Sequence, residues 1–187
     1  MPLGSCFLRL GAAACFIGPL GCSGEDTKSP GDPIKLSILG ANVAYYRSGD
    51  HFIAGQPTEE GFQNAKEEGI KTVINLRSPK EQSFDEKRVV EGLGLSYVNI
   101  PVTLETLDAS KAAEFLAAVK AAEKPILIHC ASANRASAFW AIELSLLQGV
   151  PSRQALERAE KSGLKSEPLK KFVQDYLSGT EKSGKEP

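Results

Sequence analysis

The chain has 187 residues, of which 42% are hydrophobic, and 22 Lys and Arg face 23 Asp and Glu. This length corresponds to one domain, since domains usually span about 100–200 residues. A formal net charge of -1 argues against a nucleic-acid-binding protein, which normally carries a basic excess. With two histidines and four cysteines, the sequence offers little material for a metal site, and we expect neither a metal nor a cofactor.

The N-terminal residues have the pattern of an export signal. Arg9 is the only charged residue among the first 24, and an apolar run follows it over residues 10–20. This run is too short to span a membrane, which takes about 20 residues. A basic start, a short apolar core and small residues at its end are typical of a secretory signal peptide. We therefore predict a signal peptide at residues 1–21 and an exported protein, with an uncleaved hydrophobic extension as the alternative.

The end of this segment, Leu20-Gly21-Cys22, resembles the cleavage box of bacterial lipoproteins, in which the cysteine is lipidated after cleavage. The match is incomplete, because the box favours Leu at the position that Pro19 holds. The resemblance implies a lipid anchor at Cys22 and a periplasmic or membrane-anchored protein, with plain secretion as the alternative. We expect no other contact with a membrane.

Cleavage before Cys22 would leave Cys130 as the single cysteine of the folded region. A disulfide framework needs pairs of cysteines, so none is expected in this domain. An exported domain that keeps one unpaired thiol does so in spite of oxidants. Cys130 is therefore the first candidate for a reactive residue.

The remaining sequence reads as one domain between two polar segments. Residues 23–33 are polar and rich in Pro and Gly, which predicts a tether at 22–35, a domain at 36–178 and a flexible tail at 179–187. Apolar and β-branched runs bounded by turn residues predict strands over 45–47, 52–54, 71–76, 95–100 and 126–128. Helical periodicity and capping residues predict helices over 58–68, 84–91, 108–122, 134–147, 152–161 and 167–177.

Strands that alternate with helices predict a single α/β domain, with a mainly parallel central sheet flanked by helices. In such sheets ligands bind beyond the carboxyl ends of the strands. Cys130 follows the predicted strand over 126–128 and His129. We therefore expect the chemistry on the loop over residues 130–135.

This loop reads Cys-Ala-Ser-Ala-Asn-Arg, and a helix begins at its end. Small residues between a strand and a helix can direct backbone N–H groups inward as an anion-binding nest, to which the helix N-terminus adds partial positive charge. The planar cation of Arg135 matches the geometry of an oxyanion, and this field stabilises the thiolate of Cys130. A nucleophile at the base of such a cradle can attack phosphorus or carry sulfur as a persulfide. We predict Cys130 and Arg135 as catalytic residues and a phosphate-binding loop of Ala131, Ser132, Ala133, Asn134 and Arg135.

The loop with its preceding His129 resembles the signature of cysteine-dependent phosphatases of the dual-specificity superfamily. Together with three further motifs in the expected order, it is similar to the beta-lactamase-hydrolase-like phosphatase family; these motifs are Ala54-Gly55-Gln56-Pro57, Val73-Ile74-Asn75-Leu76-Arg77 and Tyr97-Val98-Asn99-Ile100-Pro101. The resemblance covers about residues 45–165. It implies a phosphatase-like fold, a phospho-enzyme on Cys130, Arg135 as phosphate ligand, and a phosphorylated protein or a small phosphate ester as substrate.

Three departures from the phosphatase pattern leave the reaction open. Four residues separate Cys130 from Arg135, where the general phosphatase loop has five, and this shorter spacing also occurs in rhodanese-type sulfurtransferases. Ala133 occupies a position that usually holds Gly, and it resists a positive φ if the turn requires one. Ala136 stands where many phosphatases carry Ser or Thr. The alternatives are a sulfurtransferase with a Cys130 persulfide and a non-catalytic anion-binding module.

A phosphatase also benefits from a general acid that protonates the leaving oxygen. The resemblance places this acid in the loop over residues 101–108, whose carboxylates are Glu105 and Asp108. Asp108 is the better candidate by residue type, although a helix cap is its simpler interpretation. Arg77 is expected either to reach the substrate or to pair with Glu81.

Other chemistry-bearing side chains have simpler interpretations. His129 is expected to be a buried histidine that helps to set the environment of the thiol. Trp140 is expected to lie in the core behind the loop. His51 is expected to be a turn residue.

Overall fold

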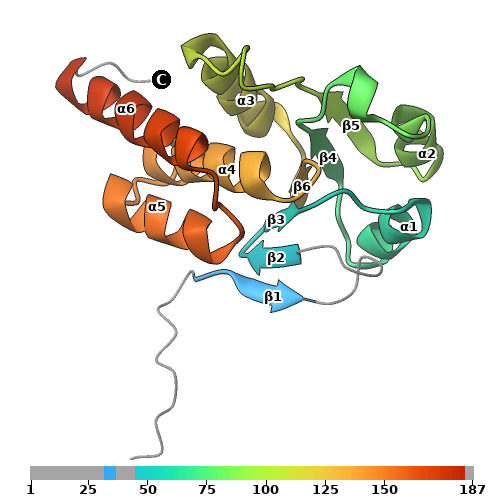
Figure 1. Ribbon diagram of the computed structural model, residues 1–187. Coiled ribbons are helices and arrows are strands. Elements are labelled where there is room, and N and C mark those ends of the chain that lie inside the picture. The colour runs from blue at the N-terminus through green and yellow to red at the C-terminus, as the bar shows by residue number, and fades with distance from the viewer. Residues whose placement is uncertain (1–31, 37–44, 184–187) are drawn as a thin grey trace, which may run out of the picture.

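The computed structural model describes residues 32–36 and 45–183 (Figure 1). The predicted signal peptide, Cys22 and most of the predicted tether lie outside these residues. The strands are β1 (Ile34–Leu36), β2 (Tyr45–Ser48), β3 (His51–Ala54), β4 (Thr72–Asn75), β5 (Ser96–Asn99) and β6 (Ile126–His129). The helices are α1 (Glu59–Glu67), the 3-10 turn η1 (Pro79–Glu81), α2 (Glu86–Gly92), α3 (Ala109–Ala121), α4 (Asn134–Leu146), α5 (Ser152–Lys161) and α6 (Glu167–Ser183). No helix in the described ranges is long and apolar enough to cross a membrane.

The strands form one sheet in the order β1-β2-β3-β6-β4-β5. Strands β3, β6, β4 and β5 are parallel neighbours, while β1 and β2 extend the sheet antiparallel beyond β3. The predicted α/β domain with a mainly parallel sheet is thus confirmed. In this register Ala54 and Asn75 both pair with His129, so the carboxyl ends of β3, β4 and β6 lie level at one edge. Cys130 begins its loop at that edge.

Helices cover both faces of the sheet, which buries β3, β4 and β6 (Figure 1). Successive side chains of a strand point to opposite faces. Ile126 and Ile128 accordingly pack in the core cluster under α3, α4, α5 and α6, whereas Leu127 packs in the cluster under α1 and α2. Trp140 is fully buried in the first cluster, which confirms its prediction as a core residue.

The folded domain begins earlier than the sequence predicts. Strand β1 lies partly within the predicted tether over 22–35 and pairs antiparallel with β2. Just before it, the carboxylate of Asp32 accepts a hydrogen bond from Lys161 Nζ at 2.6 Å. The tether prediction is therefore wrong for its last residues, because strand pairing and this ion pair hold them against the domain.

The last helix ends later than predicted. Helix α6 continues through Gly179 to Ser183, so the predicted tail over 179–187 begins inside a helix. A glycine costs about 1 kcal/mol in a helix interior, and the preceding turns of α6 outweigh that cost. The buried side chains of Leu169, Val173 and Leu177 anchor this helix on the core.

His51 is not a turn residue, because it opens β3 and is only 3% exposed. Its Nε2 lies 3.6 Å from Oε1 of Glu143, which is also buried and accepts two hydrogen bonds from Gln148. Burial, aided by the charge of Lys124, lowers the pKa of His51 to about 4. Burial also raises the pKa of Glu143, so both members of this pair favour their neutral forms.

We predict that His51→Gln flattens the pH dependence of stability between pH 6.5 and pH 4. The folded-state pKa lies below the ordinary value of 6.5, so the unfolded chain binds more protons in this window. The contribution of His51 is complete above pH 6.5 and is lost as the pH falls, by at most about 3 kcal/mol. Urea unfolding near pH 7 and near pH 4.5 measures it. An equal loss of stability in wild type and variant would contradict the prediction.

Candidate active site

The loop that was predicted to carry the chemistry lies between β6 and α4, against the end of β3. The Cys130 N–H donates to the Ala54 carbonyl, and the Gln56 N–H donates to the Ala131 carbonyl, both at 3.2 Å. Cys130 is a free thiol with 1% of its surface exposed, whereas Ala131 and Ser132 are exposed. The structure thus places the nucleophile candidate at the base of the loop and small residues at its mouth.

Ala133 turns the chain into α4 with a φ of +68°. This left-handed conformation costs an alanine about 1–2 kcal/mol. The backbone is therefore strained at Ala133, where related loops usually have Gly. Close packing against Gly163 keeps Ala133 in this conformation. The two residues are so near that a Cβ added at Gly163 would lie 3.0 Å from the Ala133 Cβ. Ala133 is also the N-cap of α4 and has no side-chain acceptor, so it leaves the first N–H groups of the helix available to an anion.

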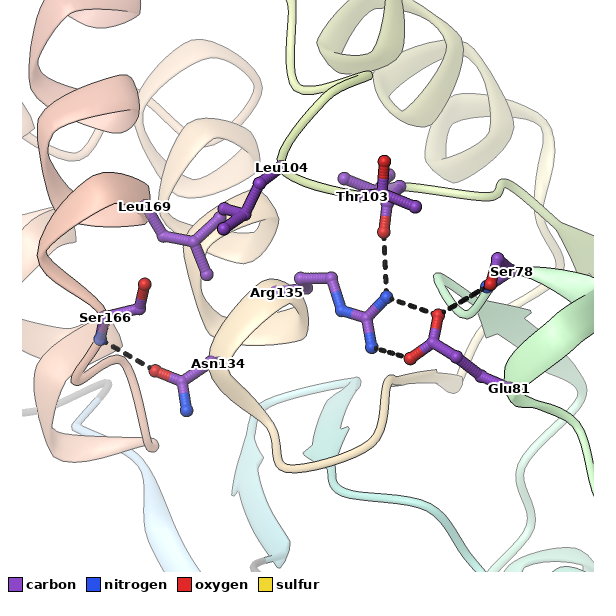
Figure 2. Close-up of a pocket in the computed structure, with 9 residues that line it drawn as sticks. Ser78, Glu81, Thr103, Leu104, Asn134, Arg135, Ser166 and Leu169 are labelled. Atoms are coloured by element: carbon purple, nitrogen blue, oxygen red, sulfur yellow. Dashed lines mark hydrogen bonds and ion pairs between the residues drawn. The ribbon is translucent and has the colours of Figure 1, made fainter.

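The side chain of Asn134 anchors the loop to the start of α6. Its Oδ1 accepts hydrogen bonds from the N–H groups of Lys165 at 2.7 Å and Ser166 at 2.9 Å, and Figure 2 shows the bond from Ser166. Its Nδ2 donates to Ser132 Oγ at 3.3 Å. Because these contacts use the side chain, a contact of Asn134 with phosphate would come from its backbone.

The guanidinium of Arg135 is held by a bidentate ion pair with Glu81 (Figure 2). Nη1 donates to Oε2 at 2.9 Å and Nη2 donates to Oε1 at 2.6 Å. Nη1 also donates to the carbonyls of Val102 at 2.8 Å and Leu76 at 3.3 Å. Such a fork fixes the plane of the cation, so the protein itself orients Arg135 and does not depend on a bound anion to do so.

The structure brings Arg135 and Cys130 together. Burial by itself would lower the pKa of Arg135, but the hydrogen bond to Glu81 and the electrostatic interaction with the nearby Cys130 side chain raise it. The bond from Arg135 in turn lowers the pKa of Glu81 to about 2 in spite of burial, and bonds from Ser78 assist. Cation, carboxylate and thiol therefore form one electrostatic unit.

Arg77 does not pair with Glu81, which corrects one of its two predicted roles. Its Nη1 donates to Gln56 Oε1, and its backbone N–H donates to Asn75 Oδ1 at 2.7 Å. Arg77 is buried, with 8% of its surface exposed, and it does not line the pocket beside Arg135. The Ser78-x-x-Glu81 spacing of a capping box, which the structure contains, could have pointed to Glu81 in the sequence.

A second carboxylate, Glu86, lies buried beneath the loop. It accepts hydrogen bonds from Gln56 Nε2 and Asn75 Nδ2, both at 2.7 Å, and its Oε1 lies 3.0 Å from His129 Nε2. Burial opposes its charge, yet the contacts with His129 leave its pKa below the ordinary value. His129 is buried, as predicted, but its partner was missed because Glu86 lies among charged residues at the start of a helix.

The two candidate acids occupy different surroundings. Asp108 is the N-cap of α3, where its Oδ1 accepts the Lys111 N–H at 2.9 Å, so the cap interpretation is confirmed. Glu105 is exposed, and a hydrogen bond with Thr103 lowers its pKa. Neither carboxylate lines the pocket beside Arg135.

That pocket has a volume of about 460 Å³. Arg135 and Glu81 lie toward one side of it, and Leu104 and Leu169 lie toward the other (Figure 2). Leu104 is 63% exposed, and no other large hydrophobic side chain in the described part of the chain is exposed. In the same part of the chain, no group of three or more His, Cys, Asp or Glu is arranged to hold a metal ion.

Comparison with solved structures identifies the fold. The crystal structure of Pseudomonas aeruginosa TpbA superposes with a TM-score of 0.67 at 21% identity, covering 83% of this chain and 94% of TpbA. Human DUSP28 superposes with a TM-score of 0.55 at 15% identity, covering 74% of this chain and 95% of DUSP28. The chain therefore has the fold of these phosphatases.

Sequence comparison gives the family. A beta-lactamase hydrolase-like protein of Xylella fastidiosa is 29% identical over 110 residues, which are 56% of this chain and 25% of that protein. The chain thus spans about a quarter of the length of this relative. The dual specificity protein phosphatase TpbA of P. aeruginosa is 23% identical over 171 residues, or 89% of this chain and 75% of TpbA. The sequence model of the phosphatase-like domain of beta-lactamase hydrolase-like protein matches residues 45–147, and the chain belongs to this family.

Proposed function

We propose that the protein is an exported cysteine-dependent phosphatase that hydrolyses phosphate esters through a phospho-enzyme on Cys130. The observation that carries this proposal is the geometry of the loop: the buried free thiol of Cys130 follows β6 at one end, and Arg135, fixed by Glu81, lies in the first turn of α4 at the other. A thiolate nucleophile beside a fixed cation and a helix N-terminus is suited to attack on a phosphoryl group.

In the first step, the Cys130 sulfur attacks phosphorus, the S–P bond forms and the bond from phosphorus to the ester oxygen breaks. Backbone N–H groups of residues 131–135 and the N-terminus of α4 hold the non-bridging oxygens. Arg135 supports the same oxygens as charge develops on them. The leaving oxygen takes a proton from a general acid, for which Asp108 is the first candidate and Glu105 the second.

In the second step, water attacks phosphorus and gives a proton to the carboxylate that served as general acid, the S–P bond breaks, and the Cys130 thiolate is released with inorganic phosphate. The Glu81 carboxylate keeps the Arg135 guanidinium in place between the two steps. This arrangement limits reorganisation during catalysis, because the cation does not have to be oriented by the substrate.

The pocket beside Arg135, which Asn134 and Arg135 of the loop line but Cys130 does not, suits the organic group of a compact substrate. Its volume of about 460 Å³ suits one amino-acid side chain or a small molecule, and the apolar Leu104 and Leu169 suit an aromatic or aliphatic group. A Cys-to-Ser form of the related TpbA has been solved in complex with pTyr. We therefore place aryl phosphates first among the phosphoprotein and small-ester substrates.

The covalent mechanism predicts distinct effects for the two loop residues. Cys130→Ser should lower the turnover of an aryl phosphate by at least about 10³-fold and still bind vanadate, because much of the cradle is backbone. Arg135→Lys keeps a charge but loses the fork, so kcat should fall by about 10²–10³-fold. Steady-state kinetics and vanadate titration measure both.

Two outcomes would contradict this mechanism. One is wild-type ester hydrolysis by Cys130→Ser. The other is a wild-type protein that transfers sulfur from thiosulfate to cyanide but hydrolyses no ester, which would favour a Cys130 persulfide and a sulfurtransferase.

The role of Asp108 is tested by the leaving group. Asp108→Asn should slow the hydrolysis of alkyl phosphates by about 10-fold or more and spare activated aryl phosphates, since only a poor leaving group needs the proton. An Asn can still cap α3, so thermal stability should change little and serves as the control. Equal rates on both ester types would leave Asp108 as a cap and make Glu105 the next candidate.

The proposed location rests on the order Arg9, apolar run and Cys22. Export followed by lipidation predicts a mature chain that begins at a lipid-modified Cys22. Mass spectrometry of the N-terminus of protein isolated from cells measures this directly. A chain that still begins at Met1 or Pro2 would contradict export, and an unmodified Cys22 would contradict lipidation alone.

A further inference from the structure

The sequence motifs outside the catalytic loop converge on the Glu86 carboxylate. Gln56 comes from the motif after β3, and Asn75 from the end of β4; each donates to Glu86 at 2.7 Å. His129, which directly precedes the nucleophile, brings Nε2 to 3.0 Å from the same carboxylate. Glu86 is 1% exposed and His129 and Asn75 are 0% exposed, so solvent does not compete for these bonds.

The protonation pattern of this cluster follows from its donors. Burial opposes the charge of Glu86, but the hydrogen bonds hold its pKa below the ordinary value, so it is a carboxylate that only accepts. Nε2 of His129 must therefore carry a proton and donate it to Glu86. Nδ1, the other ring nitrogen, is buried without a hydrogen-bond partner among the described residues.

Two further ionisable groups face the cluster from neighbouring strands. The Tyr97 hydroxyl of β5 lies 2.9 Å from Asn75 Nδ2, and burial together with the charge of Glu86 raises its pKa, which keeps it neutral. The Arg77 guanidinium, after β4, reaches Glu86 only through Gln56. His129 Nε2 thus lies at hydrogen-bond distance from the carboxylate, and the Tyr97 hydroxyl also lowers the pKa of Glu86.

The packing around His129 shows how this contact bears on Cys130. The His129 ring lies edge-on to Phe62 of α1, with the centroids 5.7 Å apart. Cys130 belongs instead to the core cluster on the other face of the sheet. The backbone between the two residues is therefore packed from both faces, and a shift of the backbone at His129 would move the Cys130 sulfur with it.

We propose that Glu86 is a positioning residue for the nucleophile. By holding Nε2 of His129, it fixes the end of β6 and with it the place of the Cys130 sulfur at the base of the cradle. Residues that orient a reacting group without touching the substrate act through small displacements, which can cost about 10²-fold in rate. The inference rests on Cys130 being the nucleophile of the proposed function.

The chain offers a matched control in its second buried Glu–His pair. Glu143 is also 1% exposed, and it lies 3.6 Å from His51 Nε2. His51 pairs with Ile126, the first residue of β6, so this pair lies at the opposite end of the strand from His129. Glu143→Gln therefore makes the same substitution in a buried Glu–His pair away from the site.

The experiment compares Glu86→Gln and Glu143→Gln in the full chain. The rate at which iodoacetamide alkylates Cys130 is measured across pH 5–9, together with kcat and KM for an aryl phosphate. We expect Glu86→Gln to slow alkylation at least 10-fold and to lower kcat by about 10–100-fold with KM within threefold. Glu143→Gln should leave all three within twofold. Because alkylation needs no ester, it tests Glu86 even in a protein without phosphatase activity.

Alkylation by Glu86→Gln within twofold of wild type, or an equal loss in both variants, would overturn the proposal. If Glu86→Gln does not fold, nitrogen-15 NMR of the wild-type His129 ring measures the protonation of Nε2 directly. A proton on Nε2 supports the proposed contact. A bare Nε2 overturns it.

Discussion

The Arg135 guanidinium is the interaction on which the site depends. It joins the η1 turn through Glu81, the segment after β5 through the Val102 carbonyl and the end of β4 through the Leu76 carbonyl. Removing the cation would leave a carboxylate and two carbonyls to find other donors, and an unpaired buried polar group costs about 1–3 kcal/mol. The residue that is proposed to bind phosphate therefore also holds together the strand ends that form its cradle, so site geometry and local stability depend on the same bonds.

The two carboxylates near the cradle, Glu81 and Glu86, are both paired with hydrogen-bond donors. In the proposed reaction, a phosphate ester brings a second anion to a thiolate, so any unpaired carboxylate nearby would repel it. Glu81 is neutralised by Arg135, and Glu86 is surrounded by donors from Gln56, Asn75 and His129. Each carboxylate therefore orients a neighbouring side chain. The N-terminus of α4 then presents its partial positive charge to the substrate.

Local patterns in the sequence predict the strands, the helices and the loop, because these elements depend mainly on residues that are close in the sequence. The apolar run over 126–128 and the small residues after it place Cys130 at a strand end before any contact is known. The partners of the site could not be predicted in this way, since Glu81 is 54 residues from Arg135 and Glu86 is 43 residues from His129. Strand β1, with three residues, is too short to show a period within a polar segment. The sequence indicated the left-handed turn only indirectly, because Ala133 occupies a loop position that usually holds Gly.

The short loop connects these observations. With four residues between Cys130 and Arg135, the cradle has one backbone N–H fewer than the general phosphatase loop, and the chain must turn sharply into α4. Ala133 makes this turn at φ +68°, and the absence of a side chain at Gly163 leaves room for its methyl group. A cradle with fewer backbone donors relies more on its side-chain cation for the developing charge. The bidentate ion pair of Glu81 with Arg135 therefore contributes more to the stabilisation of this charge than it would beside a longer loop.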